Sequence, residues 1–174
     1  MLNRLWASLA KLKYKSQKLW SADLNFYNKY IFYKIVNQHK NKFLIHCITT
    51  DVFFYMTLQE IIDDLDILYG LHPLQASFIG LEYAQILQSP TKLVDVFLKK
   101  NNPHAFRRYG NCYIHYQDEY GKICFTDTSK YQNFSLPPCE IVKNGDLISQ
   151  FDSAQAFYIG ALAGFSLKEP VAAT

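Results

Sequence analysis

The chain has 174 residues, of which 49% are hydrophobic and 19% charged, with thirteen phenylalanines and thirteen tyrosines. This composition excludes a disordered protein, and the length predicts a single domain over residues 1–174. The net charge of +3 is too small to identify a class of partner by itself.

Residues 1–22 predict a basic amphipathic helix, because leucines and a tryptophan recur there at helical spacing. The segment has no acid, and its basic residues are Arg4, Lys11, Lys13, Lys15 and Lys18. Such asymmetry is typical of an interaction arm. The same pattern also fits a core helix whose lysines face water.

Residues 23–37 continue the helical spacing, and the apolar run at residues 43–48 fits either a strand or a buried link. Thr57 and Glu60 have the spacing of a capping box, which predicts the start of a helix. The stretch around that helix has no base, and its acids are Asp51, Glu60, Asp63, Asp64 and Asp66. We expect either a solvated helix side or an acidic face, at residues 60–66, for a partner.

His72 and Pro73 predict the first residues of a further helix that stops near Ser89-Pro90. A short helix is expected at residues 91–100. The following loop combines arginines with aromatic residues, namely His104, Phe106, Arg107, Arg108 and Tyr109. This combination occurs at protein interfaces and in nucleic-acid sites. Alternatively, the two aromatic rings fix the loop to the core.

Residues 111–117 and 122–127 alternate in polarity and are rich in β-forming residues, which predicts a hairpin. Cys139 to Lys143 is a candidate third strand, and a C-terminal helix is expected at residues 153–167. The predicted fold is therefore α+β. It has a mainly helical body, a small antiparallel sheet within residues 111–143 and a C-terminal helix.

Residues 61–80 and 141–160 resemble each other at an offset of eighty residues, which predicts an internal repeat. The identical pairs are Ile61/Ile141, Asp66/Asp146, Gln75/Gln155, Ala76/Ala156, Ile79/Ile159 and Gly80/Gly160. The shared glutamine falls at the third position of each predicted helix. There it can reach back to the N-cap N–H, as in a capping box.

Small residues recur every four positions in both copies and would form one stripe on each helix. They are Ala76, Gly80 and Ala84 in the first copy, and Ala156, Gly160 and Gly164 in the second. Glycine within a helix is unfavourable by about 1 kcal/mol relative to alanine. We therefore expect the two helices to pack closely, with Gly80 near Gly160.

The sequence has neither a phosphate-binding G-x-x-x-x-G-K-[ST] motif nor a G-x-G-x-x-G motif. Cys112, His115, Cys124 and Cys139 lack the two tight pairs of a zinc module. His46 and Cys47 are adjacent and would project differently. We therefore expect no catalytic residue, metal or cofactor, and no transmembrane segment, because no apolar stretch is long enough.

The function that this sequence favours is a non-catalytic interaction or regulatory domain, adaptor-like, soluble and cytoplasmic, which binds a protein through charged surfaces. The candidate partner-binding residues are Lys11, Lys15, Lys18, His104, Phe106, Arg107, Arg108 and Tyr109. Two alternatives stay open. One is a nucleic-acid-binding protein that uses the basic N-terminal helix with Arg107 and Arg108, and the other is a small enzyme with an unrecognised site. Homo-oligomerisation is also left open.

Overall fold

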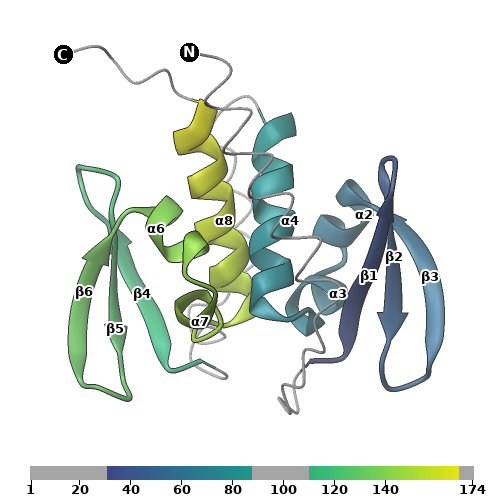
Figure 1. The fold of residues 1–174 in the computed structure, drawn as a ribbon, viewed down its shortest axis with the longest axis horizontal. Coiled ribbons are helices and arrows are strands. Elements are labelled where there is room, and N and C mark those ends of the chain that lie inside the picture. Colours follow the sequence, from purple (N-terminus) through teal and green to yellow (C-terminus); the bar gives the residue numbers. More distant parts are fainter. Residues whose placement is uncertain (1–30, 88–109, 169–174) are drawn as a thin grey trace.

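The computed structural model describes residues 31–87 and 110–168. The predictions for the N-terminal helix, the helix at residues 91–100 and the loop that includes Arg107 lie outside these ranges. Within them the chain is an α+β fold with two three-stranded antiparallel sheets (Figure 1).

Each described half places three strands before three helices. The first half consists of β1 (Tyr33–His39), β2 (Lys42–Cys47), β3 (Val52–Thr57), α2 (Leu58–Asp63), α3 (Leu65–Gly70) and α4 (Pro73–Ile86). The second half consists of β4 (Cys112–Gln117), β5 (Ile123–Asp127), β6 (Gln132–Leu136), α6 (Pro138–Lys143), α7 (Gly145–Ile148) and α8 (Ser153–Lys168). Strands that follow each other in sequence are neighbours in each sheet.

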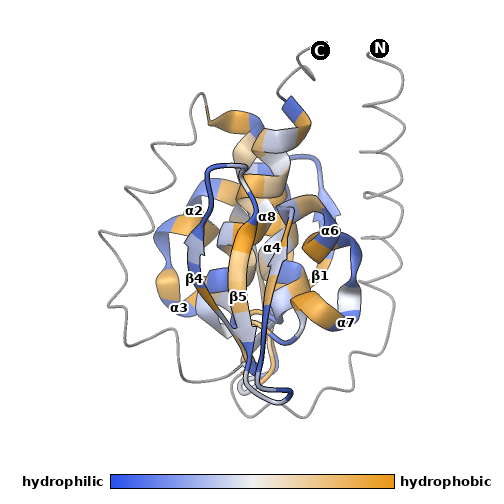
Figure 2. Cartoon of the chain, turned by 90° about the vertical axis from the view of Figure 1, so that its left-hand side faces the viewer, coloured by the Kyte–Doolittle hydropathy of each residue, from blue (hydrophilic) through white to orange (hydrophobic). Residues whose placement is uncertain are grey.

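Both sheets bury one face, because residues alternate between the two faces along a strand. In β2, Phe43 and Ile45 are fully buried while the intervening Leu44 is half-buried. In β5, Ile123 and Phe125 take the same inward positions. Figure 2 looks onto the second sheet and shows hydrophobic residues along much of β5.

The two halves share several local irregularities. The first strand of each sheet has a bulge, in β1 between Ile35 and Asn37 and in β4 between Ile114 and Tyr116. Asp51 and Tyr131, each one residue before its third strand, have positive φ angles of 56° and 53°. This conformation is uncommon for residues other than glycine.

The helix starts follow from local capping. Thr57 Oγ1 accepts a hydrogen bond from the Glu60 N–H at 3.3 Å, and the Glu60 carboxylate accepts from the Thr57 N–H at 2.6 Å. This confirms the capping box that the sequence predicts. His72 precedes α4, where its Nδ1 accepts from the Leu74 N–H at 3.2 Å, and Pro73 begins the helix as predicted.

Helices α4 and α8 lie side by side at the centre, with one sheet on the outer side of each (Figure 1). A Cβ added to Gly80 would overlap the carbonyl oxygen of Phe157, and one added to Gly160 would overlap that of Ser77. A Cβ on Gly164 would collide with the Ala84 methyl group. Ala76 and Ala156 are fully buried. The helices therefore approach at the level of their backbones.

Three expectations from the sequence need correction. Residues 33–37 belong to β1 and not to a helix, since Ile35 pairs with Ile45 of β2. Cys139 to Lys143 is not a strand but most of α6, because Pro138 is well suited to the first turn of a helix. The third strand is instead β6. With a second sheet at residues 33–57, the mainly helical body is not confirmed.

Candidate partner-binding surface

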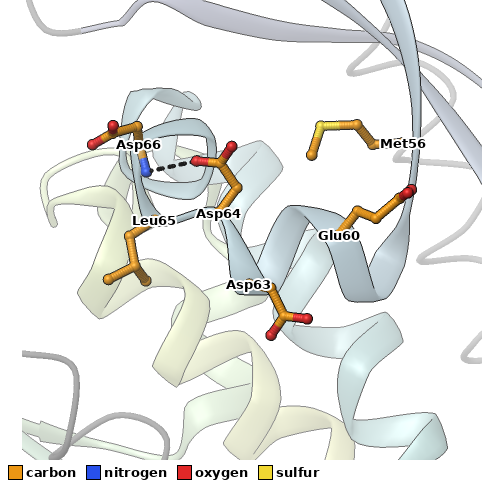
Figure 3. Close-up of a pocket in the computed structure, with 6 residues that line it drawn as sticks. All are labelled: Met56, Glu60, Asp63, Asp64, Leu65 and Asp66. Carbon is orange, nitrogen blue, oxygen red and sulfur yellow. Dashed lines mark hydrogen bonds between the residues drawn. The ribbon is translucent and has the colours of Figure 1, made fainter.

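An open hollow lies between β3 and the α2–α3 segment (Figure 3). It is lined by Met56, Glu60, Asp63, Asp64, Leu65 and Asp66. We call it the acidic hollow, because all of its charged lining residues are carboxylates. Met56 and Leu65 supply the apolar part of its lining.

Local capping brings these carboxylates together. Asp64 ends α2 and begins α3, and its Oδ1 accepts from the N–H groups of Asp66 at 3.1 Å and Ile67 at 3.2 Å. Glu60 is held by its bonds to Thr57, and the Asp63 carboxylate accepts from the Gln59 amide at 3.1 Å. The break between the two short helices therefore places several carboxylates along one side of the hollow.

Hydrogen bonds and nearby charges shift the pKa values of Glu60, in the hollow, and of Tyr33. Hydrogen bonds from Thr57, and to a smaller extent the positive charge of Lys42, lower the pKa of Glu60. Burial raises the pKa of Tyr33, and the negative charges of Cys47, Asp64 and Asp66, in that order, add to that effect. A positively charged group that enters this field is stabilised relative to water at ordinary salt concentrations.

The carboxylates do not form a metal cage. Figure 3 shows that Glu60, Asp63 and Asp66 point in different directions. Within residues 31–87 and 110–168, no group of three or more histidine, cysteine, aspartate or glutamate side chains is arranged to hold a metal ion. Charge that is spread in this way fits several cationic groups along a chain better than one compact ion.

Beside the hollow, the first sheet presents an aromatic outer face. Phe53 and Tyr55 of β3 are 54% and 59% exposed. The His46 ring stacks on Phe53 at 4.3 Å with an interplanar angle of 4°, and its Nε2 lies 2.8 Å from Asp51 Oδ1. Neighbouring exposed apolar side chains of this kind are typical of a contact surface.

The second sheet differs at the corresponding positions. Asn133 and Ser135 of β6 stand where β3 has Phe53 and Tyr55. The Asn133 side chain accepts a hydrogen bond from Thr126 at 2.5 Å, and Thr126 also contacts His115 at 2.6 Å. The exposed Phe53 and Tyr55 pair is therefore a feature of β3 that β6 does not share, although β4 of the second sheet exposes a tyrosine of its own, Tyr116.

The cysteines and histidines do not pair as a nucleophile and a base. Hydrogen bonding, chiefly from Thr49, lowers the pKa of Cys47 to about 7, but Cys47 faces the core while His46 lies on the outer face. Burial raises the pKa of Cys112 to about 11, and the more exposed His115 lies on the outer face with Thr126.

The eight partner-binding candidates from the sequence all lie outside the described residues. The acidic residues at 60–66 are the one charged surface of the sequence analysis that the structure describes, and it places them in the hollow. The aromatic face and the exposed strand β3 were missed. Their signal is the run VFFYMT at Val52–Thr57, an uncharged stretch rich in aromatic and β-branched residues.

Comparison of the chain with known protein families, with curated proteins and with solved structures finds no match. Among the helices of the described part, none is long and apolar enough to cross a membrane.

Proposed function

We propose that this protein is a non-catalytic interaction module that binds a basic segment of a protein partner at the acidic hollow. The observation that carries this proposal is that four carboxylates, of Glu60, Asp63, Asp64 and Asp66, line one hollow together with the apolar side chains of Met56 and Leu65. Lysine and arginine side chains have a charged end and an apolar stem, so they fit a surface of this mixed kind.

An adaptor or regulatory role fits this surface, because exposed charges set the rate and specificity of association more than raw affinity. The four cysteines are free, which favours a reducing compartment such as the cytoplasm. The hollow disfavours nucleic acid at this place, since carboxylates repel phosphates. The basic residues of the nucleic-acid alternative lie outside the described part of the chain.

We further propose that the two halves arose by duplication of one unit of three strands and three helices. Matching bulges, matching positive φ angles and the paired N-caps Asp64 and Asn144, both with ψ of 96°, support this proposal. In this view the halves retained their core positions and diverged at their surfaces. The acidic hollow then belongs to the first unit alone, because Lys143 stands where the first unit has Asp63.

A short capped peptide that alternates lysine and valine tests the binding proposal, with a glutamate–valine peptide as its comparison. We expect calorimetry to detect binding of the lysine peptide only. The affinity should fall as salt rises from about 0.15 M to about 1 M, because the screening length shrinks from about 8 Å to about 3 Å.

The double variant Asp63→Asn with Asp66→Asn should weaken binding several-fold, since an exposed ion pair contributes about 0.2–1 kcal/mol. The matched control is Glu140→Gln with Asp146→Asn. It removes the same charge from exposed helix positions of the second half and should leave the affinity unchanged. Equal affinity of both double variants, or equal binding of the two peptides, would contradict the proposal.

A further inference from the structure

Strand β3 is an edge strand of the first sheet, and its backbone hydrogen-bonding pattern can be determined from its neighbours. The Ile48 N–H donates to the Phe32 carbonyl at 2.8 Å, and the Ile35 N–H and C=O are both bonded to the Gln75 side chain at 2.9 Å. Hydrogen-bonded and non-bonded pairs alternate in an antiparallel ladder. Ile35 and Ile45 are therefore a non-hydrogen-bonded pair. The backbone N–H and C=O of Ile35 point away from β2, and those of Ile45 point toward β3.

The same alternation continues into β3. Ile45 pairs with Phe54 through hydrogen bonds, so the N–H and C=O groups of Phe53 and Tyr55 point outward from the sheet. The backbone of Thr57 fits the same alternation, because its N–H is bonded to the Glu60 carboxylate and not to β2. No hydrogen bond joins the outward groups of Phe53 or Tyr55 to another described residue.

The first and third strands of each sheet differ in whether their outward backbone groups are bonded. In β1 the outward N–H and C=O of Ile35 are bonded to the Gln75 side chain. In β4 the Ile114 N–H donates to the Gln155 side chain and the Cys112 N–H donates to the Gln150 carbonyl. No hydrogen bond joins the outward backbone groups of Asn133 or Ser135 in β6 to another described residue either, but both side chains are polar. In β3 the edge lacks the charges and prolines that usually prevent pairing with another chain.

The side chains beside this edge define what a partner strand would look like. A residue opposite Met56 would point to the same face as Met56, toward the acidic hollow that Met56 lines. Residues opposite Phe53 and Tyr55 would lie on the aromatic outer face. The next strand should therefore alternate basic residues, on the inner side, with apolar residues, on the outer side.

We propose that β3 receives an extended segment of a partner protein as an added antiparallel strand, with alternating basic and apolar residues. Its backbone pairs with Phe53 and Tyr55, its basic side chains reach the acidic hollow, and its apolar side chains cover the aromatic outer face. Strand addition at an open sheet edge is an established mode of peptide recognition. This inference rests on the proposed function and adds the conformation and sequence pattern of the partner.

N-methylation of the lysine–valine peptide tests the strand pairing directly. In the proposed register the valine N–H groups face β3 and the lysine N–H groups face solvent. A peptide with N-methylated valines should lose binding by at least tenfold, and one with N-methylated lysines should bind nearly as well as the parent. Equal affinities of the two methylated peptides would overturn strand addition. If the charge dependence persists in that case, only this inference fails, and the proposed function stands.

A proline substitution tests the same edge from the protein side. Tyr55→Pro removes one outward N–H without removing a hydrogen bond to β2, and prolines are tolerated at such edge positions. We expect it to abolish binding of the parent peptide. Ser135→Pro makes the equivalent change in β6 and should bind normally. Circular dichroism of both variants checks folding, and if Tyr55→Pro unfolds, the N-methylated peptides still decide.

A second copy of the chain is the competing occupant of this edge. Sedimentation of the protein alone distinguishes it, because the proposal expects a monomer at the concentrations of the binding experiments. A dimer that Tyr55→Pro dissociates and Ser135→Pro preserves would overturn the proposal. It would show that β3 pairs with a second copy of the chain and not with a partner segment. Slower amide exchange at Phe53 and Tyr55 on addition of the lysine–valine peptide would support the proposal. Unchanged exchange at both amides would overturn it.

Discussion

His72 and Asp152 occupy the same place in the two halves, one residue before the long helix, but burial acts on them in opposite directions. It lowers the pKa of His72 to about 4 and raises that of Asp152 to about 6. In both cases the neutral form is favoured. Protonation of the unfolded chain below pH 6.5 therefore destabilises the fold through His72, whereas protonation of folded Asp152 below about pH 6 opposes that effect.

Replacing His72 with asparagine separates the two contributions. Asparagine is a good N-cap residue and does not titrate. Wild type should lose up to about 3 kcal/mol more stability than His72→Asn between pH 6.5 and pH 4, because the pKa of His72 is lowered in the folded state. Urea unfolding at several pH values measures this difference. The contribution of Asp152 cancels, because both proteins contain it. Parallel pH profiles of the two proteins would contradict it.

Gln75 closes the bulged strand β1 with its side chain. Its Oε1 accepts from the Ile35 N–H and its Nε2 donates to the Ile35 carbonyl, both at 2.9 Å, and the side chain is 1% exposed. Its second-half counterpart, Gln155, accepts from the Ile114 N–H at 2.7 Å and donates to Asp152. The shared glutamines therefore connect each helix to its sheet. For Gln75 this replaces the predicted capping role, because its side-chain amide is bonded to Ile35 and not to the N-cap N–H of α4.

The Gln75→Leu variant keeps similar bulk but leaves both Ile35 groups unpaired. An unpaired buried group is unfavourable by about 1–3 kcal/mol, so the loss of stability should be at least about 2 kcal/mol. The control is Gln85→Leu on the same helix, where the side chain is exposed and its bond to Leu81 is long, at 3.5 Å. Chemical denaturation compares the two, and equal midpoints would show that Gln75 is not required to close the edge.

At the scale of elements, local signals were sufficient for some features and not for others. The capping residues Thr57, Glu60 and His72 act within a few residues, so the sequence alone identified the starts of α2 and α4. Strand β1 depends on pairing with β2 through Ile45, and the role of Gln75 depends on a partner forty residues away. Such contacts are not encoded in local periodicity, which explains why the sequence pattern predicts a helix where the structure has β1.

The candidate binding surface also has one part that the local sequence predicts and one part that depends on distant contacts. The acidic stretch at residues 60–66 was visible as a run of charges without a base, because composition alone reveals it. The edge strand beside it was not, because the exposure of Phe53 and Tyr55 depends on the order of strands in the sheet. That order places β2 between β1 and β3. Without this knowledge, the run VFFYMT reads equally well as a buried core segment.

Gly80 provides a test of the contact between α4 and α8. Alanine normally stabilises a helix relative to glycine, by about 1 kcal/mol. Gly80→Ala should instead lower stability by about 1–3 kcal/mol, because its methyl group would overlap the Phe157 backbone. Gly145→Ala is the control, since its Cβ would meet only a Leu74 methyl at 3.8 Å. It should be neutral or stabilising. Thermal unfolding measures both, and a stabilising Gly80→Ala change would mean that the helices are further apart.

At the scale of the whole molecule, the inner residues of the two sheets are similar and the outer residues are not. Phe54 and Phe134 both face the core, as do Met56 and Leu136. The exposed positions between them differ, with Tyr55 in one strand and Ser135 in the other. The two sheets therefore make comparable contributions to the core, while their surfaces can serve different purposes.

The two halves should unfold together, because their contact involves more than side-chain packing. The Ser153 hydroxyl of α8 donates to the Leu71 carbonyl, and the Lys168 ammonium donates to the Ala84 and Leu87 carbonyls. A continuous cluster of buried residues includes both sheets. Separating α4 from α8 would expose this cluster in both halves at once, so neither sheet can retain its stability alone.

Residue-resolved hydrogen exchange measures this coupling, because the most protected amides report global unfolding. We expect core amides of β2 and β5, such as those of Ile45 and Phe125, to exchange with the same opening free energy. The Gly80→Ala change should lower both by the same amount, although Gly80 lies in the first half and Phe125 in the second. If β5 kept its protection while β2 lost it, the halves would be independent units, and the α4–α8 contact would join them without making them one cooperative structure.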